Sequence, residues 1–187
     1  MNTLRLDECS SDFANREAKP AMNNFEIHSV HESDYDFILR VNEENVEVLS
    51  PMDRDGLLRF AEMAEMFSVA TVNGQRAAFL IALTEAASSY ESENYRWFKN
   101  RYEHFLYVDR IVIDEPFRKI GLGTALYQNV FHYAMLHNIP VVTAEIDTIP
   151  YNDASLKFHR RMGFEEVGTQ YVRNGQIQVS LQMVKVR

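Results

Sequence analysis

The chain has 187 residues, 46% of them hydrophobic and 12% aromatic, and 19 Lys and Arg against 27 Asp and Glu give a net charge of −8. This length and apolar fraction predict one folded domain and exclude disorder over most of the chain. The single cysteine, Cys9, excludes an internal disulfide framework and a multi-cysteine metal site. No apolar run approaches the ~18 residues that a membrane span needs, and the acidic start is unlike a secretory signal. We therefore expect a soluble, cytoplasmic protein without a membrane partner, and its acidity argues against nucleic acid.

The first half of the sequence predicts a tail followed by strands and helices. Residues 1–24 are polar and lack periodicity, which predicts a flexible tail ahead of one domain over residues 25–187. Asn73-Gly74 predicts a hairpin turn, and residues 86–104 form an insertion rich in polar and aromatic residues. The elements predicted from apolar spacing are strands over 25–30, 67–72 and 77–83 and helices over 33–50 and 54–66.

The second half alternates strands with helices. Its predicted elements are strands over 105–113, 141–146, 164–173 and 176–186 and helices over 124–137 and 153–162. Asn174-Gly175 predicts a second hairpin turn between the last two strands. The order of these elements predicts an α/β or α+β fold with a mixed sheet, without an internal repeat or a second domain.

The sharpest local pattern lies in residues 111–124, where a strand leads through a glycine-bearing loop directly into a helix. The first turn of a helix has N–H groups without internal partners, and the helix dipole adds positive charge there. Gly121 and Gly123 leave the backbone accessible, while Arg118 and Lys119 add two cations. Such a loop suits a phosphate or pyrophosphate. It lacks the P-loop pattern and the third glycine of a dinucleotide fingerprint, so alone it fits a structural turn equally well.

Two separated segments share their patterns with one enzyme superfamily. Residues 118–123 have the pattern Arg-x-x-Gly-x-Gly after a strand, and residues 152–164 are close to Asn-x-x-Ala-x-x-Phe-Tyr-x-x-x-Gly-Phe. Together they resemble the GNAT superfamily of acyl-CoA-dependent N-acyltransferases, and the order of elements extends the resemblance over residues 25–186. The implied fold is a bent sheet of about seven mostly antiparallel strands with about four helices. Its fourth and fifth strands splay apart and admit the pantetheine arm of acyl-CoA.

The resemblance implies an acetyl-CoA site at the matching positions. The pyrophosphate is expected on the backbone amides of residues 118–124, chiefly 119–123, and the pantetheine amides along the backbone of residues 111–113. Asn152 matches an asparagine near the pantetheine arm, with Ser155 one turn on, although a helix N-cap explains Asn152 equally well. The implied cofactor-binding residues are Ile111, Val112, Ile113, Arg118, Lys119, Ile120, Gly121, Leu122, Gly123, Thr124, Asn152 and Ser155.

His159 stands where the superfamily usually has a tyrosine beside the cofactor sulfur. An imidazolium can donate a proton to a departing thiolate, and a neutral imidazole can relay one near pH 7. The resemblance therefore makes His159 a candidate general acid. A histidine that only fills the space of a ring between Phe158 and the sheet is the alternative.

A base for the attacking amine is expected on the strand before Ile111. With a repeat of two, Tyr107, Asp109 and Ile111 share one face, and some superfamily members carry bases at the first two positions. Asp109 precedes an arginine, so a simple ion pair is the alternative. Glu145 on the neighbouring predicted strand is the second carboxylate candidate. A backbone amide near Val112 is expected to polarise the thioester carbonyl.

The resemblance thus implies an N-acetyltransferase that moves the acetyl group of acetyl-CoA to a primary amine by direct attack in a ternary complex. The acceptor is a small amine, an amino-acid derivative or a protein amine. No metal is expected, because the histidines lack supporting ligand spacing. One alternative is a non-catalytic acyl-CoA-binding module. Another is a subunit, for example of a homodimer, whose aromatic residues 90–102 mediate assembly instead of covering the acceptor.

Overall fold

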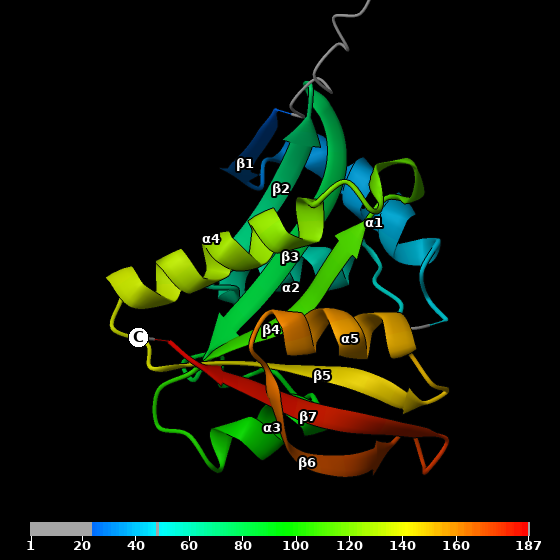
Figure 1. Ribbon diagram of the computed structural model, residues 1–187. Coiled ribbons are helices and arrows are strands. Elements are labelled where there is room, and N and C mark those ends of the chain that lie inside the picture. The colour runs from blue at the N-terminus through cyan, green and yellow to red at the C-terminus, as the bar shows by residue number, and fades with distance from the viewer. Residues whose placement is uncertain (1–23, 48, 187) are drawn as a thin grey trace, which may run out of the picture.

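The computed structural model describes residues 24–47 and 49–186 as a sheet with helices on both faces (Figure 1). The strands are β1 (Phe25–Ser29), β2 (Met66–Val72), β3 (Gln75–Thr84), β4 (Leu106–Ile113), β5 (Val141–Ile149), β6 (Glu165–Val172) and β7 (Ile177–Lys185). The helices are α1 (Tyr35–Glu43), α2 (Arg54–Met63), α3 (Glu93–Lys99), α4 (Leu122–Leu136) and α5 (Asp153–Arg161), with 3₁₀ turns η1 (Glu32–Asp34) and η2 (Glu115–Phe117). All but the last residue of the predicted tail lies outside the described residues. No helix in the described part is long and apolar enough to cross a bilayer.

The seven strands form one sheet in the order β1-β2-β3-β4-β5-β7-β6. Neighbouring strands are antiparallel except β4 and β5, which run parallel. These two strands pair only through Leu106 with Val142 and Tyr107 with Thr143, and beyond that point they separate. The mixed sheet with splayed fourth and fifth strands is therefore confirmed, with five α-helices in place of about four.

The two faces of the sheet bury separate hydrophobic cores. One core packs α1, α2 and α3 against the sheet through residues such as Ile38, Leu57 and Phe98. The other packs α4 against the opposite face through Leu126 and Val130, and α5 joins it. Figure 1 shows α4 and α5 in front of the sheet and α1 and α2 behind it.

The predicted helix over residues 33–50 is shorter than expected. It begins at Tyr35, after η1, and ends at Glu43. Asn45 Nδ2 donates to the carbonyl oxygen of Val41 at 2.8 Å, and Asn42 Nδ2 donates to the carbonyl of Ser50 at 3.2 Å. Asparagine side chains compete with the backbone in this way, which explains why apolar spacing alone overran the end of the helix.

The predicted aromatic insertion contains a helix that the sequence analysis missed. Ser92 Oγ accepts from the N–H of Tyr95 and caps the start of α3. Tyr95 and Phe98 are buried in the core. These two rings are therefore structural, and they are not free to cover an acceptor or to contact a second subunit.

β4 contains a β-bulge at Asp109. Ala82 of β3 pairs with Val108 and the preceding Ile81 pairs with Arg110, which leaves Asp109 without a partner. The extra residue reverses the alternation of side chains beyond it. Tyr107 accordingly lies in the core beneath α1–α3, while Ile111 packs on the α4 face. The expectation that Tyr107, Asp109 and Ile111 share a face is wrong for Ile111.

Candidate active site

The loop between β4 and α4 carries a row of unused backbone N–H groups. Within the described residues, none of the N–H groups of residues 119–124 has a hydrogen-bond acceptor. Gly121 is the N-cap of α4 and has a left-handed φ of 95°, which glycine adopts without strain. The helix dipole adds positive charge at the same point. The loop therefore presents a row of free donors that would suit an anion.

Two residues of the loop play other parts than the sequence suggested. A Cβ on Gly123 would lie 3.4 Å from both Ile113 Cδ1 and Phe158 Cζ, so this glycine makes room for α5 to pack. Arg118 donates from Nε to the carbonyl of Ile113 at 3.1 Å and from Nη2 to Asn45 Oδ1 at 3.0 Å. Arg118 thus ties the loop to the turn that follows α1.

Asn152 caps the start of α5. Its Oδ1 accepts from the N–H of Ser155 at 3.1 Å, the bond expected of a helix N-cap. Its side-chain amide still lines the same cavity as the loop. Capping therefore does not exclude a contact with the pantetheine arm.

His159 is buried and uses both ring nitrogens. Nδ1 lies 2.8 Å from the carbonyl oxygen of Ser155, and Nε2 lies 2.6 Å from Tyr127 Oη. A carbonyl oxygen only accepts, so Nδ1 carries the proton and Nε2 of the neutral ring accepts from the Tyr127 hydroxyl. Burial lowers the pKa of His159 from its ordinary 6.5, and burial followed by the charge of Glu145 raises the pKa of Tyr127.

Asp109 belongs to a buried ion pair on the other face of the sheet. Arg110 Nε donates to Asp109 Oδ2 at 2.7 Å, and the Tyr90 hydroxyl donates to Oδ1. The side chains of Asp109 and Arg110 are only 4% and 5% exposed. Arg110 Nη1 also donates to the buried Asn42 Oδ1 at 2.6 Å. Both oxygens of Asp109 are therefore occupied.

Glu145 on β5 has one carboxylate oxygen that accepts no hydrogen bond from the described residues. Tyr107 Oη donates to Oε1 at 2.8 Å. Oε2 is inaccessible to solvent and has no hydrogen-bond partner among the described residues. Burial, and next the negative charge of Asp109, raises the pKa of Glu145 to about 8.

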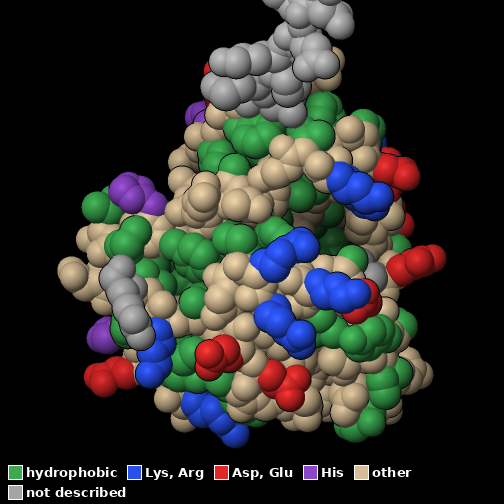
Figure 2. Space-filling view, viewed as in Figure 1, with side chains coloured by type: hydrophobic (Ala, Val, Ile, Leu, Met, Phe, Trp, Pro, Cys, Tyr) green, Lys and Arg blue, Asp and Glu red, His purple; other side chains and the backbone are tan. Residues whose placement is uncertain are grey.

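A cavity of about 1690 Å³ joins these groups across the gap between β4 and β5. Of the residues predicted from the sequence, those that line it are Asp109, Ile111, Ile113, Lys119, Gly121, Leu122, Gly123, Thr124, Glu145, Asn152, Ser155 and His159. Those outside its lining are Tyr107, Val112, Arg118 and Ile120. Lys and Arg side chains gather on the face that carries α5 (Figure 2). In the described part of the chain, no group of three His, Cys, Asp or Glu is placed to hold a metal ion.

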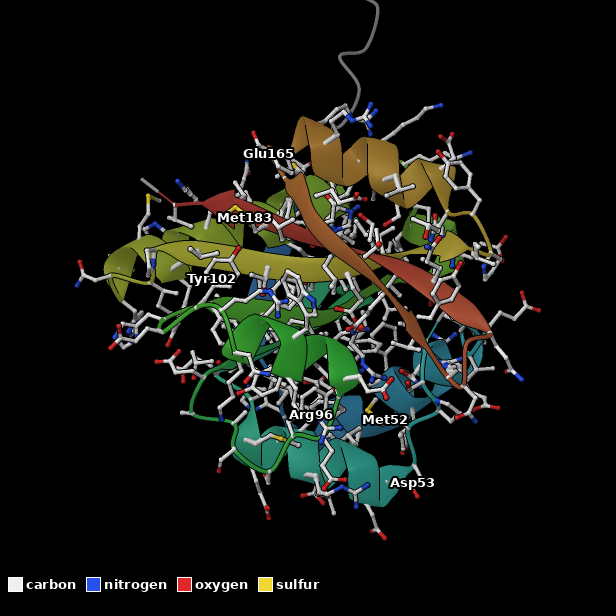
Figure 3. All side chains as sticks on the ribbon, turned by 90° about the horizontal axis from the view of Figure 1, so that it is seen from below. Met52, Asp53, Arg96, Tyr102, Glu165 and Met183 are labelled. Atoms are coloured by element: carbon white, nitrogen blue, oxygen red, sulfur yellow. The ribbon has the colours of Figure 1, made fainter. Side chains whose placement is uncertain are left out.

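The cavity also extends to the face covered by α2 and α3, and we call its lining on that side the second mouth. Figure 3 shows α5 above the strands and α2 and α3 below them, with Met52 and Asp53 labelled on the lower side. Met52 and Asp53 line the cavity together with Tyr90 and Asn94. One mouth therefore holds the amide loop and the other holds the buried carboxylates.

The sequence matches the model of the Acetyltransferase (GNAT) family over residues 26–164. The chain belongs to the GNAT acetyltransferase family. No curated protein matches the sequence.

Solved structures share the fold at low sequence identity. Ard1 from Thermoplasma volcanium is 17% identical with a TM-score of 0.70, covering 87% of this chain and 98% of that one. Arabidopsis thaliana NAA60 in complex with acetyl-CoA is 14% identical with a TM-score of 0.69, covering 87% and 100%. The ribosomal-protein-S18-alanine N-acetyltransferase from Escherichia coli is 15% identical with a TM-score of 0.63, covering 87% and 94%. At these identities the likeness shows the GNAT fold alone.

Sequence reasoning missed Tyr127, which lines the cavity beside His159. The signal that could have indicated it is its place one helical turn after Gly123, at the same end of α4 as the amide loop. Tyr127 is both a core residue and part of the cavity wall, since it is 2% exposed and borders the cavity.

Proposed function

We propose that this GNAT protein is an N-acetyltransferase that uses acetyl-CoA and a primary amine in a ternary complex. The observation that carries the proposal is one continuous cavity with unused amides at one mouth and Glu145 at the other. Direct attack requires the two substrates to meet from opposite sides, and the gap between β4 and β5 gives them that path.

The residues of the loop fit the phosphates of acetyl-CoA. Six successive N–H groups, residues 119–124, lack an acceptor within the described residues, and Lys119 stands beside them on the cavity wall. These groups would hold the pyrophosphate, and the backbone of residues 111–113 would align the pantetheine arm. Acetyl-CoA supplies an activated acetyl thioester when bound. A structure of Arabidopsis NAA60 and one of a Salmonella typhimurium acetyltransferase contain acetyl-CoA, which supports this assignment within the family.

Glu145 is the better-placed base of the two carboxylates. The oxygens of Asp109 are held by Arg110 and Tyr90, whereas Glu145 keeps Oε2 unpartnered. Its pKa of about 8 suits the removal of a proton from an ammonium near neutral pH. Tyr107 acts as a positioning residue, because its hydroxyl fixes Oε1. The thioester carbonyl would accept from a backbone amide of β4 near Val112, where this strand borders the gap.

The charges around the second mouth favour a cationic acceptor. Apart from the paired Asp109 and Arg110, its charged residues are Asp53, Glu62, Glu91, Glu93, Glu145 and Asp147 against Arg59 and Arg173. An excess of carboxylates attracts an ammonium, and it attracts an acceptor with a second positive group more strongly. We therefore place short diamines, triamines and basic peptides ahead of zwitterionic amino acids as acceptors.

A thiol-release screen with acetyl-CoA tests the proposed function. The panel contains a short aliphatic diamine, a triamine, a monoamine of equal length, an amino acid and a basic peptide, and calorimetry measures acetyl-CoA binding separately. Release with the cationic amines is expected. Binding without release from any amine would point to the non-catalytic acyl-CoA-binding module, and absence of binding would overturn the assignment of the loop.

A further inference from the structure

Tyr127 and His159 form a hydrogen-bonded pair at the wall of the cavity, between α4 and α5. Tyr127 Oη lies 2.6 Å from His159 Nε2, and the rings meet edge to face with centroids 5.2 Å apart. The Ser155 carbonyl holds Nδ1 at 2.8 Å. Both side chains are buried, yet both line the cavity. Because Nε2 is aimed at Tyr127, a proton that leaves His159 through Nε2 passes to the tyrosine hydroxyl.

We propose that the Tyr127 hydroxyl, backed by His159, protonates the departing CoA thiolate in place of the tyrosine that GNAT proteins usually carry at position 159. The inference rests on the proposed function. It makes Tyr127 the catalytic acid and His159 a positioning and proton-supplying residue. The phenol is thus retained, but α4 supplies it instead of α5.

The thiolate leaves as the carbon–sulfur bond breaks and the electron pair of that bond moves onto sulfur. Tyr127 gives its hydroxyl proton to this sulfur. At the same time the Tyr127 oxygen takes the Nε2 proton of a His159 imidazolium. His159 is left neutral with its proton on Nδ1, where the Ser155 carbonyl accepts it, and the Tyr127 hydroxyl again donates to Nε2. This end state has the hydrogen bonds seen in the structure, and water recharges His159.

The surroundings separate the acid from the base. Tyr127 and His159 lie on the face of α4 and α5, whereas Tyr107, which holds Glu145, lies in the core beneath α1–α3. Burial, and next the charge of Glu145, raises the pKa of Tyr127 and keeps the phenol protonated. Residues 122–136 of α4 contain no Asp, Glu, Lys or Arg, and the charged residues of α5 are exposed, namely Asp153, Lys157, Arg160 and Arg161. The start of β6 adds only exposed Glu165 and Glu166.

Removal and relocation of the phenol test the proposal. With the best amine of the panel, Tyr127→Phe should lower kcat by roughly 10²-fold or more, within the span of general acid catalysis. The Kd of acetyl-CoA should change less than about threefold. Tyr133→Phe is the matched control, because it also removes a hydroxyl from α4, one bonded to Glu65 and absent from the cavity lining. It should behave like the parent.

The double variant Tyr127→Phe/His159→Tyr moves the phenol to the position usual in the family. It should recover kcat to within about fivefold of the parent. Its pH profile should also change. The parent needs ionised Glu145 and protonated His159, so its kcat should be level between the pKa of His159, which burial lowers from 6.5, and about pH 8, and it should fall on either side of this range. The double variant needs only ionised Glu145 at neutral pH and should not fall above pH 8.

Each outcome decides the matter separately from the proposed function. If the parent releases no thiol with any amine, the proposed function fails. If the parent is active and a folded Tyr127→Phe keeps its kcat, the Tyr127 assignment is overturned while the function stands. Should Tyr127→Phe not fold, the parent profile decides, because a kcat that keeps rising from pH 8 to 9.5 excludes a histidine-supplied proton.

Discussion

At the scale of single residues, the pKa of Glu145 links stability to activity. Burial raises that pKa from 4.5 to about 8. Below 4.5 the carboxyl is protonated in both states, but between 4.5 and 8 it ionises only in the unfolded chain. The free energy of unfolding therefore falls as pH rises through this window and levels off above 8. The same buried carboxyl that we propose as the base thus weakens the fold at neutral pH.

The first prediction concerns Glu145→Gln, which removes this titration and keeps an acceptor for Tyr107. The Tm of the variant minus that of the parent should grow between pH 5 and pH 8.5. Growth of roughly 5 °C or more is expected, since one pKa unit is about 1.4 kcal/mol and 1 kcal/mol moves the Tm of a domain of this size by about 2–4 °C. Thermal unfolding at both pH values measures it. A constant difference would show that Glu145 ionises normally in the fold.

The second prediction separates the ligand role of Gly121 from its backbone strain. Gly121→Ala forces an L-residue into a φ of 95°, at about 1–2 kcal/mol, so the amides of the loop should shift. Calorimetric titration should show the Kd of acetyl-CoA rising about tenfold. Gly74→Ala is the control, because Gly74 has a φ of 79° in a hairpin away from the cavity. It should lose comparable stability and keep its affinity. Equal Kd values in the two variants would refute the amide assignment.

At the scale of elements, the bulge in β4 is held from α1. Asn42 is fully buried, and its Oδ1 accepts from Arg110, which in turn binds Asp109 at the bulge. The bulge therefore depends on a helix that is distant in sequence. This contact explains why two-residue periodicity could not place the side chains beyond Asp109.

The third prediction is that Asn42→Ala lowers the free energy of unfolding by about 2–3 kcal/mol, because it leaves a buried guanidinium N–H unpaired. Thiol release should slow as well, since Asp109 and the adjacent amides lose their support. Urea unfolding at neutral pH measures the first effect. Asn45→Ala removes a similar side chain from the turn after α1, whose Oδ1 binds the exposed Arg118, and it should cost less than about 1 kcal/mol. If both variants lost the same free energy of unfolding, the buried contact between Asn42 and Arg110 would not be more important than the exposed one.

The strands, α4 and α5 were predictable because their apolar periods are long and regular. α3 was not, since its two core rings, Tyr95 and Phe98, stand among exposed polar residues in a segment of only seven. The end of α1 depended on asparagine side chains that bond the backbone. The bulge at Asp109, a single residue without a partner in β3, could not be recognised from the alternation of apolar and polar residues. Local patterns thus predicted most helices and strands, whereas their irregularities depend on tertiary contacts and were not predicted.

At the scale of the whole molecule, two motifs and the order of the elements sufficed to predict the family and the sheet, and the same motifs carry the expectation of a cofactor loop. The pairing of Tyr127 with His159 joins residues 32 positions apart, and that of Tyr107 with Glu145 joins residues 38 apart. Neither pair belongs to one motif, and no spacing rule connects them. The proposed catalytic pairs therefore required the fold, whereas the proposed cofactor loop, a run of consecutive backbone amides, did not.

The last prediction uses the charge of the molecule. The net charge is −8, and the mouth beneath α2 and α3 adds its own excess of carboxylates. Attraction between this mouth and a polycation is screened by salt, because the Debye length shrinks from about 30 Å at 0.01 M to about 8 Å at 0.15 M. Raising the ionic strength over that range should therefore lower kcat/KM several-fold for a triamine and much less for a monoamine of equal length.

Glu62→Gln, an exposed change at the mouth, should reduce the salt dependence for the triamine, whereas Asp36→Asn on the exposed face of α1 should not. Equal salt dependence for the two amines would mean that the acidic mouth does not select the acceptor.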